Sequence, residues 1–143
     1  MLKTRQEMWD WLMGWVKSLP THNNNLTPFA EFVSPLLQAC VDARLNDYFR
    51  VGQSMLHIVF STAQEHGLER LNPPPLRVTI RFDSEKKQWL IGRSYGNLHF
   101  ANADREEPAD SETAFTVLKS YLADLWRETR PGESLPEPLA KTR

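Results

Sequence analysis

The sequence contains a single cysteine, Cys40, among its 143 residues. One cysteine excludes an intramolecular disulfide and a metal centre built from several thiolates of one chain. It favours a reducing compartment, so we expect a cytoplasmic protein. Long apolar runs are also missing. The longest stretch without a formally charged side chain, residues 51–64, contains glutamine, serine and histidine. Such a stretch is too short and too polar to span a bilayer, and we predict no membrane association.

The chain also lacks the sequence patterns of common catalytic, metal-binding and phosphate-binding sites. Its four histidines, at positions 22, 57, 66 and 99, lie in separate predicted elements and show no paired ligand spacing. Gly92 and Gly96 precede another strand, and no Gly-Lys-Ser/Thr follows them, as a phosphate loop would require. We therefore predict no metal site, no cofactor and no enzymatic activity.

What the chain does contain is typical of one soluble globular domain. Its residues are 41% hydrophobic and 24% charged, with 17 basic side chains against 18 acidic ones. A chain of this length buries roughly 68–70% of its unfolded surface when it folds. That is enough for a hydrophobic core that needs no disulfide bonds. Prolines at 131, 136 and 138 and a low apolar content predict a disordered tail over residues 130–143, after a single domain of residues 1–129.

The N-terminal half shows helical periodicity and predicts about three helices. Over residues 3–19, a helical wheel predicts a buried face formed by Met8, Trp11, Leu12, Trp15 and Leu19. Trp9 and Met13 lie at the edge of that face. Pro28 predicts the start of a short second helix over residues 28–33. Pro35 predicts a restart or a kink, after which helical spacing continues to about residue 49. The apolar stretch at 51–66 is predicted to be the most central helix.

From residue 76 the hydrophobic period changes from 3.6 to 2, which predicts strands. A four-residue turn at 84–87 would pair Phe82 with Trp89, Ile80 with Ile91 and Val78 with Arg93. A third strand is predicted at 98–102 after a Gly96-Asn97 turn. An acidic loop at 103–110 and a helix that ends near Thr129 complete the prediction. The fold class is therefore α+β, with a three-stranded antiparallel β-meander and a C-terminal helix packed on it.

This register divides the side chains of the meander between two faces. Arg93 falls among apolar partners, and we expect its guanidinium to lie at the sheet margin, in water or on a carboxylate. The opposite face is expected to be exposed. It would carry Arg77, Thr79, Arg81 and His99, within a segment, 76–102, that has five basic and two acidic residues.

These features predict a non-enzymatic intracellular protein-binding module, such as an inhibitor, an immunity-type protein, a chaperone or an adaptor. Binding would use the exposed sheet face or the aromatic helix edge at Trp9 and Met13, and the open sheet edges leave room for a homodimer. The alternative is a nucleic-acid-binding protein that uses the basic sheet face, although Trp89 and Tyr95 face away from it. A third hypothesis is a small-ligand-binding protein or an enzyme whose site the sequence does not reveal.

Overall fold

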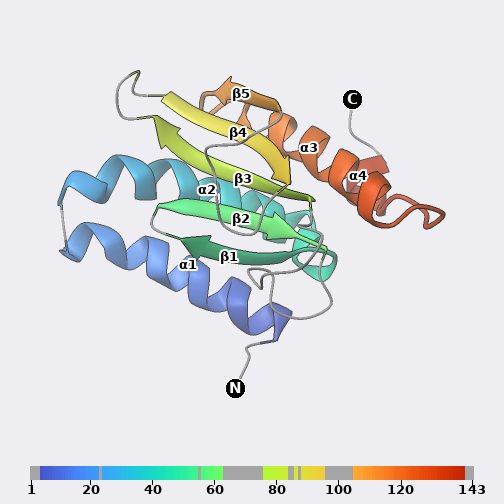
Figure 1. Ribbon diagram of the computed structural model, residues 1–143. Coiled ribbons are helices and arrows are strands. Elements are labelled where there is room, and N and C mark those ends of the chain that lie inside the picture. Colours follow the sequence, from blue (N-terminus) through green and yellow to red (C-terminus); the bar gives the residue numbers. More distant parts are fainter. Residues whose placement is uncertain are drawn as a thin grey trace.

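The computed structural model describes residues 4–22, 24–54, 56–62, 76–83, 86, 88–95 and 105–140 (Figure 1). Its elements in chain order are α1 (Arg5–His22), η1 (Asn24–Leu26), α2 (Thr27–Asp42), η2 (Leu45–Asp47), β1 (Arg50–Ser54), β2 (His57–Ser61), β3 (Leu76–Asp83), β4 (Gln88–Tyr95), β5 (Arg105–Ala109), α3 (Ala114–Thr129) and α4 (Glu137–Ala140). The predicted α+β class, with a helical N-terminal part, an antiparallel sheet and a C-terminal helix, is confirmed. Within the described residues the sheet has five strands, not the three predicted.

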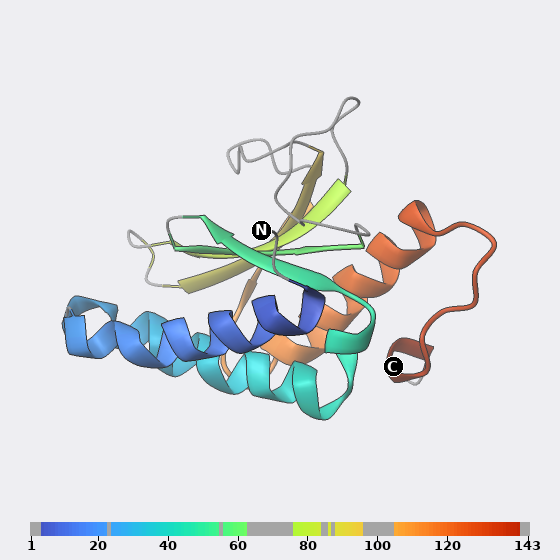
Figure 2. The same cartoon turned by 90° about the horizontal axis from the view of Figure 1, so that it is seen from below.

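The strands are neighbours in the order in which they follow one another along the chain, β1-β2-β3-β4-β5, and every pair is antiparallel. Figure 2 shows α1, α2 and α3 beneath one face of this sheet. That inner face and the three helices enclose the hydrophobic core. We call the opposite face, away from the helices, the far face. Because side chains alternate along a strand, each strand contributes to both faces.

The β3–β4 hairpin has the predicted register. Phe82 pairs with Trp89, Ile80 with Ile91 and Val78 with Arg93. Buried apolar residues on the inner face require this register, because a slip by one residue would move all of them to the far face. The predicted Gly96-Asn97 turn lies outside the described residues.

The predicted central helix at 51–66 is wrong over its described part, which is the β1–β2 hairpin. Ser54 pairs with His57, and Val51 pairs with Phe60. The run from His57 to Ser61 is rich in β-branched and aromatic side chains, which pack well on a pleated sheet. A continuous apolar run shows no alternation, so its periodicity does not distinguish a buried strand from a buried helix.

The predicted acidic loop is also corrected, because residues 105–109 form the edge strand β5. This strand is short, mostly charged and carries Pro108, features that protect a sheet edge against pairing with other chains. The third strand predicted at 98–102 lies outside the described residues. Hydrophobic alternation could not identify β5, since few of its side chains are buried.

The N-terminal helices differ from the predicted ones in their bounds. Glu7 and Thr4 cap the start of α1 reciprocally: the Thr4 amide donates to Glu7 Oε1 over 2.9 Å, and the Glu7 amide donates to Thr4 Oγ1 over 3.1 Å. A restart at Pro35, one of the two outcomes predicted there, is wrong, because α2 continues through this proline. The helix ends at Asp42, not near residue 49. Arg44 then adopts a left-handed conformation, with φ of 64°, where the chain leaves the helix.

The segment after α3, for which we predicted disorder, contains α4 in the structure. Leu139 is buried against the core. The indole of Trp126 donates a 3.1 Å hydrogen bond to the Ser134 carbonyl oxygen. These contacts fasten the residues after Thr129 to α3.

Candidate functional site

Of the seven residues predicted to bind a partner, two lie on α1, and the structure places both against the core. Trp9 is 1% exposed, and its indole nitrogen donates a 2.8 Å hydrogen bond to the Phe49 carbonyl oxygen. Its ring centroid lies 6.0 Å from that of Phe60 on β2. Met13 is half-buried and also packs against the core. Trp9 therefore joins α1 to the sheet and is not available to a partner.

The exposed tryptophan of α1 is Trp11, which we had predicted to be buried. It is 40% exposed and is the one exposed large hydrophobic side chain among the residues that the structure describes. The buried stripe of the helix consists of Trp9, Leu12, Val16 and Leu19. This stripe is turned by about 60° from the predicted face, taking 100° per residue. Including Val16, with its spacing from Trp9 and Leu12, would have predicted the correct orientation.

Trp11 is the outer end of a line of aromatic rings that we call the aromatic ladder. Its members are Trp11, Trp15, Phe29, Trp89, Phe32 and Phe82. Trp11 stacks on Trp15 with centroids 5.9 Å apart and an interplanar angle of 12°, and Trp15 meets Phe29 edge-on at 6.4 Å. Trp89 then connects Phe29 with Phe32 and Phe82, at 5.3, 4.2 and 4.6 Å. An exposed ring held in this way loses little conformational freedom on binding.

Two other predicted residues, Arg77 and Thr79, belong to β3 on the far face, which we expected to be exposed. The structure buries them: Arg77 is 4% exposed and Thr79 is 8% exposed. Val59 and Leu90 on the same face are buried as well. His99, which was also predicted for this face, lies outside the described residues. Arg77 and Thr79 therefore do not form an open surface for a partner.

Arg81, also on the far face, binds a carboxylate of its own chain. Its Nε and a terminal nitrogen donate to the two carboxylate oxygens of Glu106 over 2.8 and 2.9 Å. This bidentate hydrogen bonding raises the pKa of Arg81. The pair crosses β4 beside Gly92, where a Cβ atom would lie 3.1 Å from Cβ and Cγ of Glu106. Glycine at position 92 thus leaves room for the ion pair, and the guanidinium is not free to bind phosphate.

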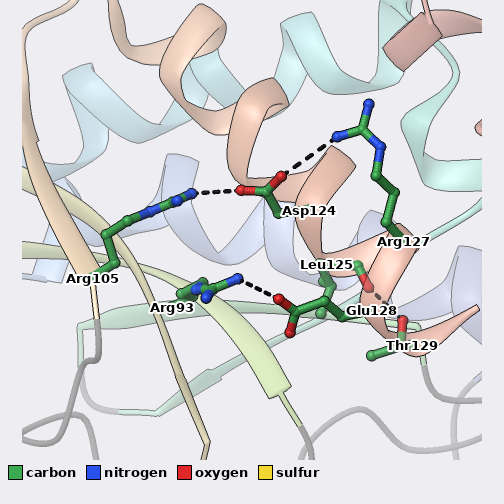
Figure 3. A network of polar contacts seen from close by, with 7 residues as sticks. All are labelled: Arg93, Arg105, Asp124, Leu125, Arg127, Glu128 and Thr129. Atoms are coloured by element: carbon green, nitrogen blue, oxygen red, sulfur yellow. Dashed lines mark hydrogen bonds and ion pairs between the residues drawn. The ribbon is translucent and has the colours of Figure 1, made fainter.

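Arg93 lies on the inner face, as predicted, and its partner is a carboxylate of α3. It donates to Glu128 over 2.8 Å, and Arg105 donates to Asp124 over 2.6 Å (Figure 3). Asp124 also accepts a 3.5 Å contact from Arg127. The network joins α3 to β4 and β5. Partly exposed pairs of this kind contribute about 0.2–1 kcal/mol each to the stability of the fold. The role of this network is therefore structural, since it connects α3 to the sheet.

The described residues contain no group of three or more histidine, cysteine or acidic side chains that could hold a metal ion. The hollow where α2, α3 and α4 meet has a volume of about 490 Å³. Its lining includes Asp42, Arg44, Lys119 and Glu137. These charges are of both signs, so the lining carries no net charge that would select an anion or a cation.

Cys40 is buried in the core, and burial raises the pKa of its thiol to about 12, an effect that Lys119 partly opposes. Since its ordinary pKa is 9.0, the stabilisation from keeping the thiol neutral is present below pH 9 and is lost as the pH rises towards 12. We expect iodoacetamide at about pH 8.5 to alkylate Cys40 only after unfolding in guanidinium, as measured by intact mass. Rapid alkylation of the folded protein would contradict this burial.

Comparison with protein-family models, with curated proteins and with solved structures gave no match. Within the described part of the chain, no helix has the length and apolar character needed to cross a membrane. The outer end of the aromatic ladder on α1 is thus the candidate site that the geometry supports best.

Proposed function

We propose that the protein is a non-enzymatic protein-binding module and that it binds its partner through the outer end of the aromatic ladder. The observation that carries this proposal is the exposure of Trp11, at 40%, together with its stacking on Trp15. Tryptophan is enriched among the residues that contribute most to binding at protein interfaces. A partner that packs on this ring would remove its exposed apolar surface from water.

The surroundings of Trp11 support the same function. Glu7 lies about one turn before Trp11, and Asp10 and Lys17 are also exposed on α1, so these charged side chains would provide a polar rim on one side of the ring. Protein interfaces commonly combine an apolar centre with such a rim. Because Trp15 is packed against Phe29 of α2, the exposed ring is connected to the core and its position is fixed before binding.

The far face of the sheet, which the sequence predicted as a binding surface, gives little support to this proposal. Arg77 and Thr79 are buried, and Arg81 is bound by Glu106. The nucleic-acid alternative depended on these arginines, and no observation of the described residues favours it. The proposed surface therefore moves from the sheet to α1.

Affinity capture tests the proposal. The tagged protein and its Trp11→Ala variant would be compared for the partners that they retain from cells that naturally produce the protein. We expect Trp11→Ala to reduce recovery of a specific partner by at least about tenfold, because truncation of a central aromatic residue removes 2 kcal/mol or more of binding free energy. Quantitative mass spectrometry would measure this recovery.

Phe115 provides a matched control. It is a half-buried aromatic residue on α3, with the Lys119 ammonium 4.6 Å from its ring centroid. Phe115→Ala is expected to retain the partner that Trp11→Ala loses. Equal recovery with the wild-type protein and with Trp11→Ala, while both remain folded by circular dichroism, would refute the proposal.

A further inference from the structure

The outward surface of α1 has a flat spot beside the exposed ring. Gly14 lies one turn after Trp11 and is exposed, and a Cβ atom at this position would have no heavy atom within 4 Å. Residues three apart in a helix are surface neighbours, so the projecting indole and the glycine lie next to each other. The same short surface therefore presents a projection and a flat spot.

Charge is distributed along this surface with opposite signs at its two ends. The exposed acidic residues Glu7 and Asp10 precede Gly14, and the exposed Lys17 follows it. At about 1.5 Å per residue, Asp10 and Lys17 lie about 6 and 4.5 Å on either side of Gly14 along the helix axis. Two such helices that run antiparallel and cross near Gly14 would place acid against base at both ends. A parallel pair would place like charges together.

We propose that the partner of this surface is a second copy of the chain. In this dimer the two α1 helices pack antiparallel about a two-fold axis near Gly14. Trp11 of each copy covers the flat spot at Gly14 of the other, and Asp10 of each copy pairs with Lys17 of the other. Such self-complementarity is what an interface with two-fold symmetry requires. This inference rests on the proposed binding function of Trp11, and it identifies the partner as a second copy of the chain.

Sedimentation analysis of the full chain from about 1 µM to 1 mM tests the inference, since association would appear as a mass that rises with concentration. We expect a dimer of the wild-type protein. Asp10→Lys alone and Lys17→Asp alone should each weaken it by at least about tenfold, because each places like charges together twice. The double variant restores both pairs and should return the dissociation constant to within about threefold of the wild-type value.

Gly14→Gln separates loss of the interface from loss of the fold. Glutamine fills the flat spot but favours a helix more than glycine does, so we expect a monomer whose thermal midpoint is unchanged or higher. A wild-type protein that stays monomeric throughout the range, or a double variant that does not regain the dimer, would overturn the inference.

The two proposals fail in different ways. If the wild-type chain is monomeric but Trp11→Ala loses a captured partner, only the proposed dimer is refuted, and the proposed binding function of Trp11 stands. If Trp11→Ala dimerises and captures partners as the wild-type protein does, both proposals are refuted.

Discussion

Replacing Trp9 by alanine is expected to lower the free energy of unfolding by about 3–5 kcal/mol. The indole is 1% exposed and packs 6.0 Å from Phe60, so its removal leaves a cavity between α1 and the sheet. It also removes the donor of the 2.8 Å hydrogen bond to the Phe49 carbonyl oxygen. Because the buried acceptor is left without its donor, we expect a loss toward the upper end of this range. Guanidinium unfolding, followed by circular dichroism, would measure the change.

Trp11→Ala is the matched control for this experiment. Its ring is on the same helix but exposed, and its main described contact is the stack on Trp15. We expect a change of no more than about 1.5 kcal/mol, the upper value for an aromatic pair. If the two variants were equally stable, the orientation that we assign to α1 would be wrong.

Gly92→Val is expected to lower the free energy of unfolding by about 2–4 kcal/mol through steric overlap. A Cβ atom at this position would lie 2.8 Å from the backbone carbonyl oxygen of Arg105 and 3.1 Å from Glu106 Cβ. The first of these atoms belongs to the backbone of β5, so β5 has to move away from β4. That movement would also separate Glu106 from Arg81. Amide hydrogen exchange of the variant and the wild-type protein would locate this movement: the exchange rate should increase more in β5 than in β2.

Gly14→Ala is the control for the glycine substitution. Nothing lies within 4 Å of a Cβ atom at Gly14, so there is no overlap, and alanine is favoured over glycine in a helix by about 1 kcal/mol. The free energy of unfolding should therefore rise. A Gly92→Val protein as stable as the wild type would show that β4 and β5 do not approach as closely at this point as described.

Where the sequence alternates regularly, it predicted the fold well. The β3 residues Val78, Ile80 and Phe82 alternate with polar residues, and this pattern was sufficient to predict every pair of the β3–β4 hairpin that we named. The unusual position of Arg93 followed from the same register. Its partner, Glu128, lies 35 residues further along the chain, and only the packing of α3 on the sheet brings the two together.

Where the burial of a residue depends on segments far away in the sequence, the sequence-based predictions were wrong. The β1–β2 hairpin was predicted as a helix, since a strand buried on both faces shows no alternation: Ile58 and Val59 point to opposite faces and both are buried. The far face was predicted to be exposed because Arg77, Thr79 and Arg81 are polar. The structure buries the first two and pairs the third, an outcome that the composition of one strand does not reveal.

The sequence predicted an aromatic edge on the first helix but assigned it to residues that the structure does not expose. An excess of aromatic side chains on the first helix indicated a binding edge, which was assigned to Trp9 and Met13. The structure instead presents Trp11, because the stripe that contains Val16 packs inward. Two tryptophans two positions apart point to nearly opposite sides of a helix, so a moderate error in its orientation exchanges the buried residue for the exposed one.

The central claim is that α1 directs Trp11 outward, where it binds a partner or a second copy. Fluorine NMR of protein labelled with 5-fluorotryptophan tests it most directly, because each of the five tryptophans gives one signal. Trp9→Phe and Trp11→Phe would assign the two signals of interest. In dilute protein, a soluble paramagnetic agent should broaden Trp11 strongly and Trp9 weakly, and Trp11 should become protected in the complex. A Trp9 signal broadened more than that of Trp11, or a Trp11 signal equally broadened in the complex, would contradict the claim.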